Sequence, residues 1–212
     1  QLELMDKLGG FIGISINNAS LYSKIEEQNR KIQDLNSQLG LRVEKLSTIA
    51  TTDKLTGLYN FAYFKDTLSS LIQNKPVQSN MSLIIADIDH FKSFNDTYGH
   101  QIGNVVITMV AKSIQNAVRA EKDIVCRYGG EEIVIILRDC TLEGAARLAE
   151  RVRESVEALQ VPIENDQFVG VTISLGCAEH LNETDNDLIE MADKALYEAK
   201  EGGRNQVRVF KR

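Results

Sequence analysis

The stretch Ser82-Leu-Ile-Ile-Ala-Asp-Ile88 decides the fold, because it is a continuous apolar run that carries an acidic residue near its end. A run of this length without polar alternation is typical of a β-strand buried on both faces. Asp87 lies within it and Asp89 just beyond it, where an acidic side chain is costly unless it meets a cation. We therefore expect a central strand that delivers two carboxylates to one end of a sheet.

The hydrophobic period alternates on both sides of this strand. Helical spacing recurs over residues 61–72, 105–120, 143–159 and 185–201, and short strands are expected at 123–128, 133–137, 168–177 and 206–210. Gly129-Gly130-Glu131-Glu132, between two of these strands, is a hairpin turn signal. Helices that cross between strands, together with one hairpin, predict an α/β fold with a mixed central sheet flanked by helices.

Composition narrows the class of protein. The 212 residues are 43% hydrophobic and 25% charged, which is ordinary for a globular chain. No run approaches the roughly 18 apolar residues of a membrane span, so we expect no membrane segment in this fragment. Cys126, Cys140 and Cys177 are scattered, and we expect them to be reduced in a cytoplasmic protein. The net charge of −6 argues against nucleic acid as the main partner.

A heptad pattern precedes the α/β region and predicts a helical stalk. Seven of its ten core positions are Ile or Leu; they are a positions Asn18, Ile25, Ile32, Leu39 and Leu46, and d positions Leu21, Gln28, Leu35, Arg42 and Ile49. Such a seam favours a two-stranded coiled coil, and hence a homodimer. The alternative is one amphipathic helix packed on its own domain, but no intervening turn lets the helix fold back.

Residues 2–16 are more apolar and contain a Gly9-Gly10 break, as in the docking end of an upstream sensory domain. Because the sequence begins at Gln1 in mid-pattern, we expect it to belong to a longer protein. We predict two parts. Residues 1–50 are the end of a sensory domain and a coiled-coil signalling helix, and residues 51–212 are one catalytic α/β domain.

Two acidic pairs are candidate metal ligands. If the hairpin lies beside the first strand, Asp87 and Glu131 converge on one point, and such carboxylate oxygens are what Mg²⁺ prefers. The alternative is that these acids are solvated loop charges. Gly129 and Gly130 favour the first interpretation, because they let the backbone approach a ligand closely.

Basic residues nearby suit a phosphate. We expect Phe91–Asp96 to be a loop that runs through Gly99-His100 and Gly103-Asn104 into a helix, whose start offers free N–H groups to an anion. Lys92 could neutralise charge on a phosphoryl oxygen. Lys200 and Arg204 flank Gly202-Gly203 at a helix end, where the alternative is a favourable interaction with the helix dipole.

Together these motifs resemble the GGDEF family, the diguanylate cyclases. The stretch Arg127-Tyr-Gly-Gly-Glu-Glu-Ile133 is similar to the family signature in its Gly-Gly-Glu-Glu form. Four further blocks agree in order and spacing: Asp53-Lys-Leu-Thr-Gly-Leu-Tyr-Asn60, Asp87-Ile-Asp-His-Phe-Lys-Ser-Phe-Asn-Asp96 with Gly99-His100, Ser174-Leu-Gly176, and Ala192-Asp-Lys-Ala-Leu-Tyr-Glu-Ala-Lys200 with Gly203-Arg-Asn205. The resemblance implies a palm-like fold and the condensation of two GTP into cyclic di-GMP, with loss of two pyrophosphates.

The resemblance also implies roles for individual residues. Asp87, the backbone carbonyl of Ile88 and Glu131 would hold Mg²⁺ (or Mn²⁺), and Glu131 would accept the 3′-hydroxyl proton. The remaining implied residues are Glu132 beside it, Lys92 at the transition state, Lys200 and Arg204 on the phosphates, Asn95 and Asn104 at the base, and His100, Gly129 and Gly130 lining the nucleotide site. Each domain would bind one GTP, so the stalk would bring two half-sites together and pass on a sensory input.

The chain departs from the family pattern at several positions. Asn104 stands where the family usually has Asp, and Asn suits adenine at least as well as guanine. The enzyme could therefore also accept ATP and make cyclic AMP–GMP, unless Asn95 still enforces guanine. The product-inhibition motif Arg-x-x-Asp keeps Asp123 but has Ala120 at the Arg position, with Arg119 one residue too early, so we expect weak or no inhibition there. Ile133 replaces the usual Phe, and Phe61-Ala62 replaces the common Arg-Arg. A catalytically silent module that binds GTP and relays a signal is the remaining alternative.

Overall fold

The computed structural model describes residues 21, 24, 28–40, 42, 47–74, 79–163 and 167–211. The chain divides into two units, Gln1–Ala50 and Thr51–Arg212, and each is described by itself. In the first unit, residues 28–40 and 47–50 are helical. The seam positions Leu21, Ile32, Leu35, Leu39 and Ile49 are exposed there, between 49% and 60%. Asn18, Ile25 and Leu46 lie outside the described residues.

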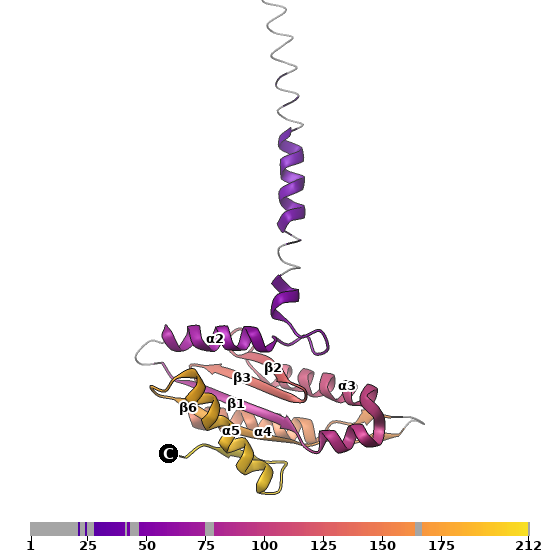
Figure 1. Cartoon of the computed structure of the whole chain (residues 1–212), viewed down its shortest axis with the longest axis vertical. Coiled ribbons are helices and arrows are strands. Elements are labelled where there is room, and N and C mark those ends of the chain that lie inside the picture. The colour runs from indigo at the N-terminus through magenta and orange to yellow at the C-terminus, as the bar shows by residue number, and fades with distance from the viewer. Residues whose placement is uncertain are drawn as a thin grey trace, which may run out of the picture. The chain divides into compact units, whose positions relative to one another are not determined.

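The second unit is built on a five-stranded mixed sheet of order β2-β3-β1-β6-β7 (Figure 1). The strands are β1 (Met81–Ile88), β2 (Ile124–Gly129), β3 (Glu132–Arg138), β6 (Ile173–His180) and β7 (Val207–Val209). β1 runs antiparallel to both β3 and β6, and β7 is parallel to β6. A separate two-stranded ribbon joins β4 (Val161–Pro162) to β5 (Phe168–Val169). The predicted central strand and mixed sheet are confirmed.

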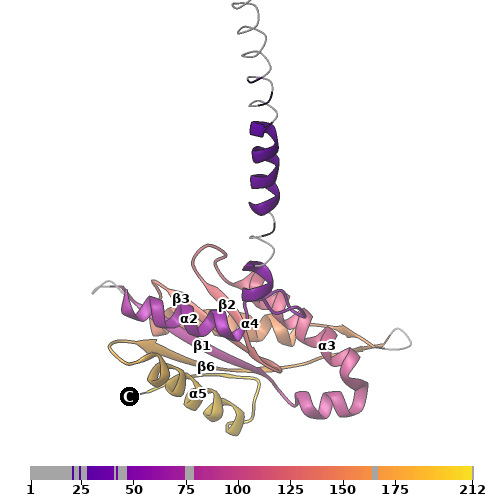
Figure 2. The same ribbon diagram turned by 45° about the horizontal axis from the view of Figure 1, so that its top comes forward.

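Helices cover both faces of the sheet (Figures 1 and 2). They are α2 (Phe61–Gln73), α3 (Phe91–Ala117), α4 (Leu142–Glu157) and α5 (Asp185–Glu201). Because side chains of β1 alternate, Ile84, Ala86 and Ile88 join the core under α3 and α4, while Leu83 and Ile85 join the core under α2 and α5. All eight residues of β1 are buried, as the unbroken apolar run predicted. The fold is thus the predicted palm-like sheet with helices on both faces.

Two predicted elements differ from the structure. The helix expected from residue 105 already begins at Phe91, so the expected loop over Phe91–Asp96 is helical. Gly99 (φ 81°) kinks this helix. The kink shifts the repeat of apolar residues between Phe91 and Val106. The first turns of the helix therefore do not share the helical spacing that predicted the rest. The strand expected over 168–177 is two strands, β5 and β6, since the backbone leaves the extended ladder between Val169 and Ile173.

The structure explains why Ser174 and Gly176, from the short Ser-Leu-Gly block, occur on β6. A Cβ at Gly176 would clash with backbone atoms of Ala192 and Leu196, so α5 packs directly against the strand at this point. Ser174 is fully buried and turns its hydroxyl toward the end of β1. This close approach brings the C-terminal end of α5 to the same sheet end as Asp87.

Within the described part of the chain, no helix is both long and apolar enough to cross a membrane. The cysteines Cys126, Cys140 and Cys177 are free thiols. Burial raises the pKa of Cys126 and of Cys177 to about 12, so neither is ionised near neutral pH.

Candidate functional site

The β1–β3 pairing brings the two acidic motifs together. Asp87 lies opposite Glu132 in the antiparallel register, and the turn that precedes Glu132 carries Gly130 and Glu131. Gly130 adopts φ 51°, and the space in front of Gly129 and Gly130 is open. The hairpin therefore lies beside the central strand, as the convergence of Asp87 and Glu131 requires.

A cavity of about 390 Å³ lies at this end of β1. Its lining includes four acidic and three basic side chains: Asp87, Asp89, Asp96, Glu131, Lys92, Lys200 and Arg204. Ile88 also lines it, beside Asp87. An arrangement in which basic side chains share a cavity with paired carboxylates suits a metal–phosphate complex better than either a metal or an anion alone.

Lys200 and Asp87 form an ion pair in this cavity. Lys200 Nζ lies 2.9 Å from Asp87 Oδ2, and the carboxylate is largely buried. Burial raises the pKa of Asp87, and the negative charges of Glu131 and Asp89 add to this shift, while the hydrogen bond and charge of Lys200 oppose it. Burial likewise raises the pKa of Glu132, and the negative charge of Asp87 raises it further. These carboxylates are short of positive charge, which a divalent cation would supply.

The start of α3 forms the wall between this cavity and a second one. Lys92 is exposed on the first turn of α3 and lines both. The second cavity, of about 520 Å³, adds Asn95, His100, Asn104 and Gly130 to its lining. The predicted substrate-binding residues, with the exception of Gly129, therefore line one of two adjoining cavities that share Lys92 and Glu131.

Asn95 carries an unsatisfied acceptor in the second cavity. Its Oδ1 is buried and no donor reaches it in the described structure. Gly103 makes room for it, because a Cβ at that position would clash with Asn95 Oδ1. A buried acceptor without a donor lowers stability, and such a group is expected where a ligand supplies the donor.

Two functional contacts were not foreseen from the sequence. Arg127 donates to Asp53 Oδ1 and Oδ2 at 3.2 and 3.1 Å, and to the carbonyl of Gly130 at 2.9 and 2.7 Å. It thereby ties the segment that follows the stalk to the turn that carries Glu131. Asp89 accepts hydrogen bonds from Thr172, Ser174 and Asn205. Asp53, Arg127 and Ser174 lay in the quoted motifs, whereas nothing in the sequence singled out Thr172.

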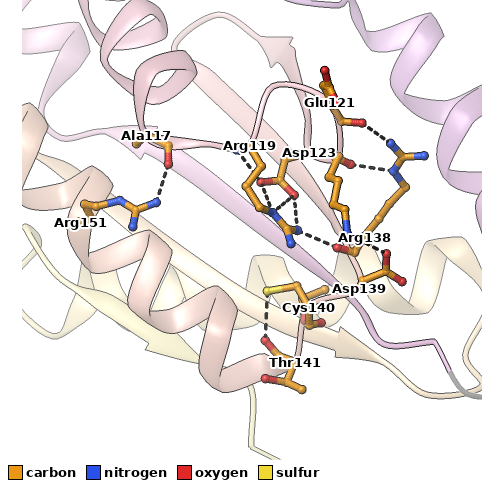
Figure 3. Close-up of polar contacts among 11 residues, drawn as sticks. Ala117, Arg119, Glu121, Asp123, Arg138, Asp139, Cys140, Thr141 and Arg151 are labelled. Atoms are coloured by element: carbon orange, nitrogen blue, oxygen red, sulfur yellow. Dashed lines mark hydrogen bonds and ion pairs between the residues drawn. The ribbon is translucent and has the colours of Figure 1, made fainter.

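The opposite end of the sheet carries a different charge cluster (Figure 3). The side chain of Asp123 is 1% exposed, and the backbone N–H and Nε of Arg119 donate to its carboxylate at 2.8 and 3.0 Å. Arg119 Nη2 also donates to the carbonyl of Arg138 at 2.7 Å. Asp123 is therefore a structural cap for this loop, already paired with the residue one position before the expected Arg site.

The part of the chain that the structure describes contains no group of three or more His, Cys, Asp or Glu side chains arranged to hold a metal ion. The predicted ligand set is smaller, with two carboxylates, Asp87 and Glu131, and the carbonyl of Ile88. A set of this kind leaves coordination positions for phosphate oxygens and water, as Mg²⁺ bound with a nucleotide requires. The residues present thus fit a divalent cation that arrives with its substrate.

Comparison with known proteins identifies the family of this chain. Residues 50–206 match the family described as diguanylate cyclase, GGDEF domain. The chain belongs to the GGDEF family. The resemblance drawn from the five motif blocks is therefore confirmed.

Several relatives are similar along most of the chain. Diguanylate cyclase A of Treponema denticola is 32% identical over 99% of this chain and 58% of its own length. The response regulator PleD of Caulobacter vibrioides is 40% identical over 75% of this chain and 36% of its own. Among solved structures, the coiled coil and GGDEF domain of DgcB from Caulobacter crescentus, in complex with c-di-GMP, has a TM-score of 0.78 at 32% identity, covering 90% of this chain and 99% of that one. This chain thus spans about half or less of these curated relatives.

Proposed function

We propose that the protein is a diguanylate cyclase, which condenses two GTP into cyclic di-GMP and releases two pyrophosphates. The observation that carries the proposal is the cavity in which Asp87 and Glu131 meet Lys92, Lys200 and Arg204, adjoining a second cavity lined by Asn95 and Asn104. Acids, phosphate-binding cations and base-reading amides occur there in the order of a bound nucleotide. Family membership supports the same reaction.

Mg²⁺ (or Mn²⁺) is part of the proposal. Asp87, the carbonyl of Ile88 and Glu131 would hold it, and when bound it would lower the cost of negative charge on the α-phosphate. The protein residues do the rest. Glu131 takes the proton of the attacking 3′-hydroxyl, with Glu132 beside it, and Lys92 balances charge on the phosphoryl oxygens. Lys200 and Arg204 hold the phosphates, so that the pyrophosphate leaves in line with the attack.

The ion pair of Lys200 with Asp87 implies an exchange on binding. In the free protein, Lys200 supplies the positive charge that Asp87 lacks. With a triphosphate bound, Lys200 would pair with a phosphate oxygen, and Asp87 would then be available to hold the metal. The cavity then changes its pairing without leaving a buried charge unpaired, which is the condition for binding at low cost.

Product identification tests this function directly. The protein is incubated with Mg²⁺ and GTP, and the products are identified by mass spectrometry. We expect cyclic di-GMP and pyrophosphate, and loss of both on chelation of the metal. GTP binding without any product would instead favour the alternative of a catalytically silent signalling module.

We further propose that the stalk makes the enzyme a homodimer and controls it. One domain offers one nucleotide site, whereas cyclic di-GMP contains two nucleotides, so two domains must meet. The exposed seam residues Ile32, Leu35 and Leu39 support pairing of two stalks, because exposed apolar side chains at heptad spacing favour a coiled coil. The bridge from Asp53 through Arg127 to Gly130 could carry a change in the stalk to Glu131.

A matched pair of stalk variants tests the dimer. Leu35→Lys places a charge in the seam, whereas Ser37→Lys places the same charge two residues away, outside the a and d positions. We expect Leu35→Lys to become monomeric by light scattering and to lose specific activity at low protein concentration. Ser37→Lys should behave as the parent. Equal activity and mass in both variants would remove the stalk from the mechanism.

Asn104 favours a second candidate activity, the synthesis of cyclic AMP–GMP. Asn104 is exposed and lines the second cavity, together with Asn95. Its side chain offers one acceptor and one donor, whereas Asp would offer two acceptors to the N–H groups of guanine. With equal GTP and ATP, we expect the mixed product to form and Asn104→Asp to suppress it. Cyclic di-GMP as the sole product of the unmodified protein would refute this activity.

We also propose a cytoplasmic location. It is supported by the three free cysteines, which are typical of proteins that remain in a reducing compartment.

A further inference from the structure

Asp89 lines the cavity that also contains Lys200 and Arg204, called the phosphate cavity below. Its carboxylate already accepts hydrogen bonds from other residues of the protein. Thr172 Oγ1 donates to Oδ2 and Ser174 Oγ donates to Oδ1, both at 2.7 Å. The backbone N–H of Asn205 donates to Oδ2 at 3.0 Å. Asp89 is 6% exposed, so three donors take up most of the capacity of a carboxylate that solvent hardly reaches. Asp89 therefore differs from Asp87, whose ion-pair partner is the single side chain of Lys200.

The third donor, Asn205, is the neighbour of Arg204 in the loop that follows α5. Arg204 and Asn205 adopt φ 62° and 45°, a left-handed conformation that residues other than glycine rarely adopt. Such backbone persists only where surrounding contacts hold it. Asp89 supplies one of these contacts from the end of β1, at the Asn205 backbone itself.

Further bonds hold the same loop from the side of α4. Asn205 Nδ2 donates to Glu157 Oε1 at 2.8 Å, and Arg153 Nη1 donates to Asn205 Oδ1 at 3.0 Å. The N–H of Arg204 donates to the carbonyl of Ala199 at 3.0 Å. The loop that carries Arg204 is thus held from β1, α4 and α5, and Arg204 itself lines the phosphate cavity.

We propose that Asp89 is a positioning residue that acts through Arg204. By binding the Asn205 N–H, it holds the strained loop in the one conformation that presents Arg204 to the phosphates. Asp89 touches neither metal nor nucleotide in this role. The inference rests on the proposed function, because the task of Arg204 is defined by the triphosphate.

Two substitutions at Asp89 separate positioning from ligation. Asp89→Ala removes all three hydrogen bonds, and we expect kcat/KM for GTP to fall by about 100-fold, mainly through KM, as for a misplaced binding group. Asp89→Asn keeps the shape, since its carbonyl can accept from Asn205 and Thr172 while its amide donates to the Ser174 hydroxyl. We expect Asp89→Asn to recover most of the lost activity. An Asn variant as inactive as the Ala variant would point to a need for the charge and overturn the proposal.

A double-mutant cycle tests the route through Arg204. If Asp89 acts by placing Arg204, then adding Asp89→Ala to Arg204→Ala causes little further loss, because the group to be placed is gone. If the two losses multiply, Asp89 acts on its own and the proposal is wrong. A merely structural role would also multiply, so this readout distinguishes positioning from general destabilisation.

Two further measurements keep the test decisive. Thr172→Val removes one donor at nearly constant shape and should give an intermediate rise in KM, which covers the case in which Asp89→Ala fails to fold. Thermal melts, with the exposed Glu143→Gln on α4 as control, report folding. Calorimetric titration with GTP and Mg²⁺ repeats the cycle on affinity. An unmodified protein that binds GTP without turnover would defeat the proposed function alone, and the affinity cycle would still decide the role of Asp89.

Discussion

The two ends of the central sheet use the same kinds of side chain in opposite ways. At the Asp87 end, carboxylates crowd one cavity, burial raises the pKa of Asp87 and of Glu132, and Asn95 Oδ1 has no donor. At the Asp123 end, the buried carboxylate accepts hydrogen bonds from the backbone and guanidinium of one arginine (Figure 3). Among the described residues, one buried acceptor at the first end has no donor and the Asp87 carboxylate has only Lys200 as a partner, whereas at the second end the loop itself pairs the buried carboxylate.

This difference separates a site for a ligand from a structural contact. A folded chain gains stability when it pairs its buried polar groups, so groups left unpaired indicate what an outside partner must bring. At the Asp87 end the missing items are positive charge and a hydrogen-bond donor, which a metal ion and a nucleobase would supply. Charge content alone would not have distinguished the two ends.

The largest expected effect follows removal of Glu131. Glu131→Ala deletes a metal ligand and the proton acceptor together, and we expect product formation to fall by at least about 100-fold, the lower range for loss of a catalytic base. Initial rates with GTP and Mg²⁺ measure it, with Glu143→Gln on exposed α4 as the matched acidic control. Turnover that survives Glu131→Ala would break the assignment of this residue.

The two ends of the sheet are compared most directly when the same change, Asp to Asn, is made at Asp123 and at Asp87. Asp123→Asn puts an amide against a backbone N–H and a guanidinium that are both donors, so we expect a loss of about 1–3 kcal/mol in the free energy of unfolding. The rate per folded molecule should not change. Asp87→Asn should abolish turnover, yet in EDTA its free energy of unfolding should equal or exceed that of the parent protein. Urea melts at neutral pH measure both; equal destabilisation by the two variants would remove the contrast.

The pH dependence of stability gives the same contrast with a smaller amplitude. Burial raises the pKa of Asp87 and of Glu132, so the folded state binds protons more readily than the unfolded state. Their destabilising contribution is fully present above these raised values and is relieved as the pH falls through them. In EDTA, we expect the parent protein to lose less stability on mild acidification than Asp87→Asn or Glu132→Gln. Parallel curves for all three would show that these groups are not perturbed by folding.

Much of this organisation could be predicted from the sequence because its signals are local. The unbroken apolar run of β1, the glycine turn before Glu131 and the five motif blocks each lie within a few residues. The sites that escaped depend on distant partners. Asp89 binds Thr172 and Asn205, which are 83 and 116 residues away. Arg127 binds Asp53 across 74 residues. The first turns of α3 escaped for another reason, since the kink at Gly99 interrupts the helical period.

The smallest expected effect concerns inhibition by product at the Asp123 end. Arg119 and Ala120 lie in the loop between α3 and β2, and in that loop the Arg119 guanidinium pairs with Asp123. With Ala120 at the expected Arg position and the Asp123 carboxylate occupied, we expect added cyclic di-GMP to leave the initial rate unchanged at saturating GTP. The exchanged pair Arg119→Ala with Ala120→Arg restores the motif spacing and removes the guanidinium from Asp123, so inhibition should appear in that variant. Strong inhibition of the unmodified protein that persists at saturating GTP would mean that Arg119 leaves Asp123 when product binds, and that this end of the sheet also has a ligand.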